Sequence, residues 1–462
     1  MSRPLVSVCI PARDAARHLG AALEGALSQN VELEVLVGDD GSRDATAQVA
    51  RATGDVRVRC FRHRTPIGVA DNRSFLLGRA RGRHVAWLDA DDVWPADSLA
   101  ARVRLLEEQP GIAIVHAGFD LIGGDDEPLP PWDAPFDRDA IEPSATAFGN
   151  LVASNELTTS TVVARRDLQL EAGGFRAWIG PSSTDWDMWL RLALRGEVAY
   201  LAQTAARYRR HADSISARTE RDGRRLRCDV RLIGALLASE AGRLPSPALT
   251  RERACAALAA KAVLHAGELQ ARGEREPAAR AAGLGARLFP DAGPQAWSDL
   301  AAAARTGDDA GSFGSGRELL GALAGHLEGT RFGARLRRAA RTDPAWQSAL
   351  ERMARVVASV TPSDAVLGAV AKWDPTLLTL SGRQGRNYPD RALLPDGYPR
   401  DDAQAIAHLE DLRAGGVSHL VLPSASFWWL EYYRDLARHL EHRHRLAWRD
   451  EDCVIYDLRP AA

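Results

Sequence analysis

The sequence has almost no lysine, little cysteine and no long uninterrupted run of apolar residues. Of its 59 basic residues only Lys261 and Lys372 are lysines, so arginine supplies nearly all of the positive charge. The 61 acidic residues bring the formal net charge to -2, which excludes a whole-chain field that would attract nucleic acid or an anionic membrane. So strong an arginine bias is typical of a GC-rich genome, and an isolated arginine therefore carries no functional weight.

The cysteines are too far apart to form a C-x-x-C pair, which argues against a zinc-binding motif and a disulfide framework. We therefore expect a reducing compartment, the cytoplasm. The first apolar run closes at Pro11 and Asp14, so it is too short for a signal peptide. No stretch approaches the ~20 apolar residues of a membrane-spanning helix. Peripheral attachment to a membrane is the one kind of membrane association that we still consider. The five cysteines are Cys9, Cys60, Cys228, Cys255 and Cys453.

Short apolar runs alternate with amphipathic segments in the first part of the chain. This alternation predicts strands joined by helical crossovers, and hence a mostly parallel sheet of the α/β class. Ligands of such sheets bind beyond the carboxyl ends of the strands. The expected strands cover residues 5–12, 33–40, 56–63 and 84–89, and the expected helices cover residues 15–29, 44–53 and 69–81.

The rest of the chain changes character twice. Residues 120–148 are rich in Asp and Pro and predict a long surface loop. Ala- and Leu-rich helical segments follow, interrupted at 307–316 by "GDDAGSFGSG", which predicts a linker. The last hundred residues regain α/β character. We therefore expect three parts: a Rossmann-like α/β domain (1–218), a helical spacer or dimerisation region (219–360) and a small α/β domain (361–462).

The segment "HVAWLDADDVW" places three carboxylates directly after a predicted strand, at Asp89, Asp91 and Asp92. Hard divalent cations take oxygen ligands, often one or two carboxylates together with substrate phosphates. The alternative is an acidic turn that caps the next helix. The position after a buried strand favours the metal site, with Asp92 as the cap of the following turn.

Two further acidic segments are ambiguous by themselves. In "GDDGSRD", Asp39 and Asp40 follow a strand and could accept hydrogen bonds from a uracil imide or a ribose, or they could belong to a helix N-cap. In "TDWDMWLRL", Asp185 begins a predicted helix and could act as a general base. Asp185 and Asp187 could equally do no more than complement the helix dipole.

The segment "YRRHADSIS" places two arginines before His211. Arg209, Arg210 and His211 could bind a diphosphate or a metal ion. A lone Arg-Arg-His is more often a solvated surface, so this segment gains weight only in combination with the others.

As an ordered set, these segments and "RTPIGVADNRS" resemble the catalytic domain of family 2 glycosyltransferases, which have the GT-A fold. The resemblance covers residues 5–216, a little under half of the chain. It implies an Asp91 metal site for Mg²⁺ or Mn²⁺, with His211 as a metal or diphosphate contact and Asp185 as the catalytic base. The family often has Glu where Thr184 stands, so Asp187 is kept as a second candidate base. The resemblance implies donor-binding roles for Pro11, Ala12, Asp14, Asp39, Asp40, Arg73 and Asp89.

The resemblance implies an inverting transfer from a nucleotide sugar, with a UDP-sugar favoured, to a hydroxyl of a glycan or lipid-linked acceptor. Bacterial surface polysaccharide or glycoconjugate synthesis is the expected setting. A nucleotidyltransferase is disfavoured because the first loop, "PARDAARHLG", lacks a Gly cluster. A non-catalytic scaffold is the remaining alternative.

Residues 415–459 resemble a module appended to bacterial glycosyltransferase-like proteins. Their aromatic-rich "PSASFWWLEYY" could bind a sugar ring, but a packed core or interface is the preferred interpretation. We expect no second active site in this module.

Overall fold

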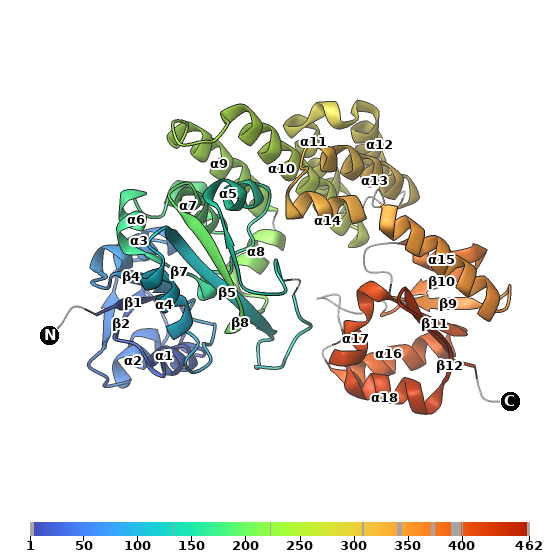
Figure 1. Ribbon diagram of the computed structural model, residues 1–462, viewed down its shortest axis with the longest axis horizontal. Coiled ribbons are helices and arrows are strands. Elements are labelled where there is room, and N and C mark those ends of the chain that lie inside the picture. The colour runs from blue at the N-terminus through green and yellow to red at the C-terminus, as the bar shows by residue number, and fades with distance from the viewer. Residues whose placement is uncertain are drawn as a thin grey trace. The chain divides into compact units, whose positions relative to one another are not determined.

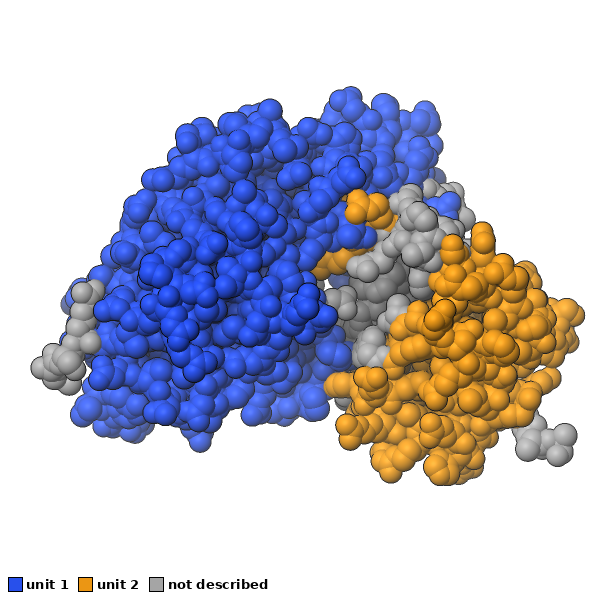
Figure 2. All heavy atoms as spheres, in the orientation of Figure 1, with its two compact units in different colours: residues 1–334 blue, residues 335–462 orange. Residues whose placement is uncertain are grey.

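The computed structural model describes residues 4–132, 134–221, 223–306, 309–339, 344–370, 375–389, 399 and 401–459 (Figure 1). The chain divides into two compact units, residues 1–334 and 335–462 (Figure 2). Each unit has a sheet of its own, and the predicted α/β class is confirmed for both. No helix within these described ranges is long and apolar enough to cross a membrane.

The first unit is built on an eight-stranded sheet in the order β3-β2-β1-β4-β7-β5-β8-β6. Four parallel strands form one half of the sheet, as the βα alternation predicts. Their register sets Ala12 beside Asp39 and Cys9 beside Trp87, so the carboxyl ends of the central strands meet at one edge. These strands are β1 (Val6–Ala12), β2 (Leu33–Asp39), β3 (Val58–Arg62) and β4 (His84–Trp87).

The other half of this sheet mixes directions. β7 (Val163–Arg165) runs antiparallel to both β4 and β5 (Ile112–Ile122). β5 and β8 (Glu197–Arg209) pair in parallel, and β6 (Ala140–Glu142) closes the edge antiparallel to β8. The predicted mostly parallel sheet is therefore confirmed, with β7 and β6 as its antiparallel members.

Helices cover both faces of this sheet, because side chains of a strand alternate between the two faces. Val8 and Ile10 of β1 belong to the core that also holds the apolar side chains of α1 and α4. Cys9 belongs to the opposite core, which α3, α5 and α7 share. The helices are α1 (Leu19–Leu27), α2 (Thr46–Ala52), α3 (Val69–Arg79), α4 (Ala100–Glu108), α5 (Ser144–Ala153), α6 (Arg166–Glu171) and α7 (Thr184–Ala193).

Two predicted loops are wrong in part. The expected loop 120–148 contains the end of β5, all of β6 and the start of α5, because its apolar residues pair with β8 or pack inward. The expected linker 307–316 is helical from Asp309 onward, within α13 (Asp309–Gly325). Its glycines are compatible with a packed helix: a Cβ added at Gly316 would lie 3.4 Å from Val263 on α10. Small residues here allow the helices to approach closely.

The helical array that follows the sheet begins with α8 (Ile215–Arg221) and α9 (Arg224–Ser239). Its longest member is α10 (Pro247–Ala271), which packs against α9, α11 and α13. Ser246 caps α10 by accepting a hydrogen bond from the Leu249 N–H. The remaining helices are α11 (Arg275–Leu288), α12 (Pro294–Thr306) and α14 (Arg331–Ala339).

The second unit contains a five-stranded sheet in the order β10-β9-β11-β13-β12. Its core confirms the preferred interpretation of the aromatic segment, since Trp429 and Tyr433 are buried beside Leu436 and Tyr456. The strands are β9 (Val366–Ala369), β10 (Gln384–Asn387), β11 (His419–Pro423), β12 (Arg445–Arg449) and β13 (Cys453–Asp457). The helices are α15 (Pro344–Val360), α16 (Asp402–Ala414), α17 (Trp428–Tyr432) and α18 (Arg434–Arg443).

Candidate active site

The candidate site begins where β1 and β2 end side by side. The Asp40 N–H donates a hydrogen bond of 2.8 Å to the Ala12 carbonyl, which continues the pairing of the two strands past their ends. Pro11 and Ala12, both buried, thus lie directly beside the residues at the end of β2. The first predicted donor-binding residues are therefore neighbours in space.

Asp39 and Asp40 have different surroundings. Both oxygens of Asp40 accept backbone hydrogen bonds, from the N–H groups of Ile67 (2.6 Å) and Gly68 (3.0 Å), which fixes the loop before α3. Asp39 Oδ1 accepts the Ser42 N–H at 2.9 Å. Asp39 Oδ2 lies 3.3 Å from Arg62 Nε but has no hydrogen-bond partner among the described residues. Asp39 Oδ2 therefore has an unused acceptor position, whereas each Asp40 oxygen already accepts one backbone hydrogen bond.

The loop after β1 is held by reciprocal hydrogen bonds with the loop after β2. The Asp14 N–H donates to Ser42 Oγ at 2.9 Å, and Asp14 Oδ1 accepts the Arg43 N–H at 2.7 Å. Asp14 adopts φ 49°, a left-handed conformation that asparagine and aspartate tolerate better than most residues. These contacts replace the first turn of the helix expected from residue 15, which begins only at Leu19.

Arg73 of α3 lies beneath the end of β4, where it meets the first carboxylate of the acidic segment. Its Nη2 donates to Asp89 Oδ1 at 2.8 Å, and the guanidinium is almost fully buried, 5.7 Å from the centre of the Phe175 ring. Burial raises the pKa of Asp89, as do the nearby charges of Asp91 and Asp185, while Arg73 opposes this rise. One cation therefore faces three carboxylates.

Asp91 and His211 form the partly exposed pair of the site. His211 Nε2 lies 2.9 Å from Asp91 Oδ2. The exposed fraction is 25% for the His211 side chain and 32% for the Asp91 side chain. The His18 ring lies 6.0 Å from the His211 ring, centre to centre. The structure thus brings together the two residues that were predicted as metal ligands, although they are 120 positions apart.

Asp92 is a buried anchor, which corrects its expected role as a turn cap. Ser160 Oγ donates to its Oδ2 at 2.5 Å, and the Arg209 N–H donates to its Oδ1 at 2.8 Å. Burial is the main cause that raises the pKa of Asp92 well above its usual range, with Asp91 and Asp89 adding to the effect. Asp92 therefore joins β8 and the segment Thr159–Thr161 to the acidic turn.

Arg209 holds the acidic turn from below and is not a surface residue. Its Nε donates to the Asp91 carbonyl at 2.7 Å, its Nη1 to the Gly123 carbonyl at 3.0 Å, and its Nη2 to Asp126 Oδ1 at 2.7 Å. Only 2% of the residue is exposed. A diphosphate-binding role for Arg209 is therefore wrong: its guanidinium is already engaged in positioning Asp91.

The two candidate bases lie in contrasting surroundings at the start of α7. Asp185 is half-buried, and its Oδ2 accepts a hydrogen bond of 3.0 Å from Thr159 Oγ1. Asp187 is fully buried, with Oδ2 accepting from Arg191 Nη2 at 2.6 Å and Nε at 3.0 Å. Arg176 Nη1 lies 3.3 Å from its Oδ1. Asp187 thus has the contacts of a structural ion pair, whereas Asp185 is partly exposed and has no arginine partner among the described contacts.

The family of this domain follows from comparison with known proteins. Residues 7–144 match the family model described as "Glycosyl transferase family 2". These residues form a family 2 glycosyltransferase domain. The family resemblance predicted from the motifs is thereby confirmed for this part of the chain.

Curated relatives match a little under half of the chain. An uncharacterized protein from Mycobacterium tuberculosis is 33% identical over 217 residues, which are 44% of this chain and 59% of that protein. The chain thus spans about 59% of the length of the first relatives. The putative teichuronic acid biosynthesis glycosyltransferase TuaG of Bacillus subtilis is 28% identical, over 46% of this chain and 82% of that protein. The crystal structure of Staphylococcus aureus TarS 1-349 has a TM-score of 0.49 and 16% identity, over 69% of this chain and 91% of that chain.

Two residues near the candidate site were missed by sequence reasoning. Thr159, in the short helical turn Thr159–Thr161, orients Asp185 through its hydroxyl. Burial lowers the pKa of Arg225 of α9, but the nearby charges of Glu220, Asp229, Asp185 and Tyr208 raise it overall. No local sequence pattern marks Thr159 or Arg225 as a site residue, because the fold brings both to the site from positions far away in the sequence.

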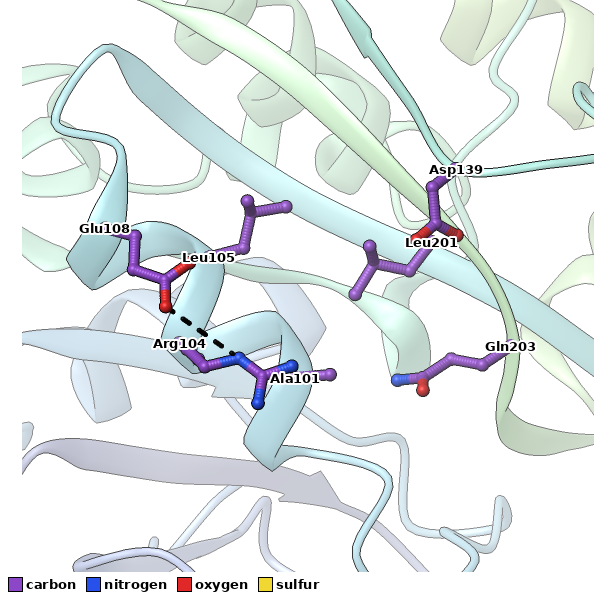
Figure 3. Close-up of a pocket in the computed structure, with 7 residues that line it drawn as sticks. All are labelled: Ala101, Arg104, Leu105, Glu108, Asp139, Leu201 and Gln203. Carbon is purple, nitrogen blue, oxygen red and sulfur yellow. Dashed lines mark ion pairs between the residues drawn. The ribbon is translucent and has the colours of Figure 1, made fainter.

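A shallow hollow occurs elsewhere in the glycosyltransferase domain, between α4 and the β8 side of the sheet (Figure 3). Arg104 and Glu108 of α4, which lie 4.0 Å apart, line one side, and Asp139 and Gln203 line the other. None of the predicted site residues lines this hollow. We therefore define the candidate site by the side chains that meet there and not by this hollow.

Proposed function

We propose that this chain is an inverting, metal-dependent glycosyltransferase that transfers a sugar from a nucleotide sugar to an acceptor hydroxyl. The observation that carries the proposal is the convergence of Asp89, Asp91 and Asp185 around Arg73. This group lies at the carboxyl edge of the parallel strands, where ligands of α/β sheets bind. Asp89 and Asp91 lie within residues 7–144, which match the family 2 glycosyltransferase model.

The donor nucleotide is proposed to bind over the ends of β1 and β2. Asp39 Oδ2 is the acceptor that remains available there, and an imide N–H of uracil is a matching donor. The loop at Asp14, which is hydrogen-bonded to Ser42 and Arg43, would enclose the uracil ring of the nucleotide. A relative named as a UDP-glucose-dependent glucosyltransferase, from Escherichia coli, is 25% identical over 46% of this chain, which favours a UDP-sugar.

Asp91 and His211 are proposed to hold Mg²⁺ or Mn²⁺. A carboxylate oxygen and an imidazole nitrogen 2.9 Å apart suit adjacent positions around one octahedral ion, whose ligand distances of about 2.1 Å set neighbouring donors roughly 3 Å apart. Two protein ligands leave room for the diphosphate oxygens that such ions usually bind. When bound, the ion supplies charge neutralisation for the departing diphosphate.

Asp185 is proposed as the general base. Its carboxylate would take the proton of the acceptor hydroxyl while that oxygen bonds to the anomeric carbon and the bond from this carbon to the diphosphate breaks. Thr159 holds one carboxylate oxygen, and the partial exposure of Asp185 leaves access for the acceptor. Asp187 is less suited to this role because two arginines surround it.

The acceptor is proposed to be a glycan or a lipid-linked sugar of a bacterial surface polymer. Two relatives carry names that point to this setting: one names teichuronic acid biosynthesis, the other a diphosphoundecaprenol-linked acceptor. Peripheral membrane attachment would fit a lipid-linked acceptor.

The test is a screen of nucleotide sugars for binding and turnover, with and without Mn²⁺. We expect the wild-type chain to bind one class of nucleotide sugar and to hydrolyse it slowly, and Asp91→Ala to bind it more weakly. Asp125→Ala is a matched control, because Asp125 is exposed in the neighbouring turn and pairs with Arg17. If no nucleotide sugar binds, or if Asp91→Ala and Asp125→Ala bind equally well, the enzymatic proposal fails and a scaffold role becomes preferable.

A further inference from the structure

A cluster of metal-ligating side chains lies in the second unit, where α16 packs against α18 (Figure 1). Glu410 comes from the last turns of α16, His439 from α18, and His444 directly follows the end of α18. Among the residues that the structure describes, this is the one group of three His, Cys, Asp or Glu side chains whose ligand atoms all lie within 4.8 Å of one another. The glycosyltransferase domain contributes nothing to it.

The spacing within the cluster matches the requirements of one small cation. Glu410 Oε1 lies 2.8 Å from His439 Nε2 and 3.6 Å from His444 Nε2. Tetrahedral zinc with ligand distances of about 2.0–2.1 Å sets its donors roughly 3.4 Å apart. The two measured separations lie on either side of this value. Small side-chain rotations would therefore suffice to place an ion between the three atoms.

The end of α18 is what brings His444 into the cluster. In a continuous helix, residues five apart point roughly 140° away from each other, so His439 and His444 would face different directions. The helix instead ends at Arg443, and His444 is extended, with φ -131° and ψ 150°. Both imidazoles consequently face Glu410.

His444 provides a second and independent observation. Its side chain is 94% buried, with only 6% exposed, yet neither ring nitrogen has a hydrogen-bond partner among the described residues. A buried polar group without a hydrogen-bond partner destabilises the fold unless another group satisfies it. Its Nε2 faces Glu410 Oε1.

We propose that Glu410, His439 and His444 bind one divalent cation of the zinc class, with water in the fourth position. Two imidazole nitrogens and one carboxylate oxygen favour zinc and its neighbours over magnesium and calcium, which prefer oxygen ligands. Bound zinc would satisfy the buried imidazole of His444 and fasten the end of α18 to α16.

Arg413 also contacts this cluster and has two opposing effects. Its Nε donates to Glu410 Oε2 at 2.6 Å, which leaves Oε1 pointing toward the histidines, as outer contacts of metal ligands commonly do. Its positive charge disfavours a second cation nearby.

A plain ion pair between Glu410 and a protonated His439 is the competing interpretation, and it gives His444 no role.

The experiment uses the tag-free full-length chain carrying Asp91→Ala, so that the glycosyltransferase site does not contribute a metal. After dialysis against a chelator, the protein is titrated with zinc, and bound metal is counted by elemental analysis. Cobalt(II) in place of zinc reports the coordination geometry through its visible absorption. We expect one zinc per chain, and a cobalt spectrum typical of four-coordinate sites.

Three variants and one matched control decide the outcome. His439→Ala, His444→Ala and Glu410→Gln should each lose the bound zinc. His442→Ala should keep it, because His442 lies between the two histidines in sequence but is exposed, and its Nδ1 is hydrogen-bonded to the Arg438 carbonyl. His439 and Glu410 are more exposed than His444, so their variants remain informative if His444→Ala unfolds. Absence of zinc from the parent, or equal zinc in His439→Ala and His442→Ala, overturns the proposal.

Discussion

Replacing Asp187 by asparagine should destabilise the first unit without removing a substrate contact, whereas the same change at Asp185 should lower activity and leave stability nearly unchanged. Asp187 is fully buried and shares its two oxygens between Arg191 and Arg176. Arg191 is buried too, and its other nitrogens donate to the carbonyls of Ala172 and Gly174. The neutral amide would leave the charge of Arg191 inside the protein without its counter-ion.

The magnitude follows from this geometry. Removing one partner of a buried ion pair typically costs about 3–5 kcal/mol, because the remaining charge stays desolvated. At Asp185, asparagine retains an oxygen that can accept the Trp186 N–H, so the cost in stability should stay below ~1 kcal/mol. Loss of the base at that position should instead lower turnover by a factor of ~100 to ~10,000.

Urea unfolding of both variants, followed by tryptophan fluorescence, measures the first quantity, and transfer from the nucleotide sugar found in the screen measures the second. Activity is compared at low temperature and low urea, where both variants remain folded. The reasoning is refuted if Asp187→Asn is as stable as the wild type, or if folded Asp187→Asn loses more activity than Asp185→Asn. Equal activity of both variants with the wild type would mean that neither carboxylate is the base.

Three further predictions address binding, pH dependence and packing. Asp91→Ala should abolish the increase in UDP affinity that Mn²⁺ produces, measured by calorimetry with and without the ion; an unchanged increase would place the ion elsewhere. Burial, assisted by Arg331, lowers the pKa of His116 from 6.5 to about 3, so the unfolded chain binds a proton that the folded chain does not. The free energy of unfolding should therefore fall by about 2 kcal/mol between pH 6.5 and pH 5, and His116→Phe should remove that part of the slope in urea titrations. Gly82→Ala would bring a Cβ within 2.5–2.6 Å of the backbone at the start of β1 and should cost about 1–3 kcal/mol, whereas Gly78→Ala, with open space around it in α3, should be neutral or slightly stabilising in thermal melts.

Periodicity predicted the parallel half of the first sheet because β1, β2 and β4 are buried along their whole length and read as apolar runs between helical segments. The same reasoning failed at residues 309–316, where Gly and Ser were taken to mean a linker. Gly316 of this segment packs close to Val263 of α10, and only the identity of the neighbouring helix reveals this. It also failed at residues 140–142, which form β6 through pairing with β8, a partner some sixty residues later.

The site shows the same division between local and non-local information. The motif order identified Asp39, Asp91, Asp185 and His211, since each follows a strand or begins a helix at the edge where ligands bind. Their partners were not predictable: Thr159 reaches Asp185, and Arg209 reaches the Asp91 carbonyl, only through the fold. Burial, the property that separates Asp185 from Asp187, is likewise not encoded in a two-residue spacing.

The electrostatics of the acidic turn argue for the proposed cation. Asp89, Asp91 and Asp92 lie within four positions, and the protein reduces their repulsion by burying Asp92 behind Ser160 and by pairing Asp89 with Arg73. These devices use up the buried positive charge, because Arg209 is itself paired with Asp126 and with backbone carbonyls. A diphosphate arriving at Asp91 would add negative charge to a turn whose own cations are already neutralised. A positive charge that arrives with the donor would therefore favour its binding, and we propose the partly exposed Asp91–His211 pair as the place where a divalent ion would meet both.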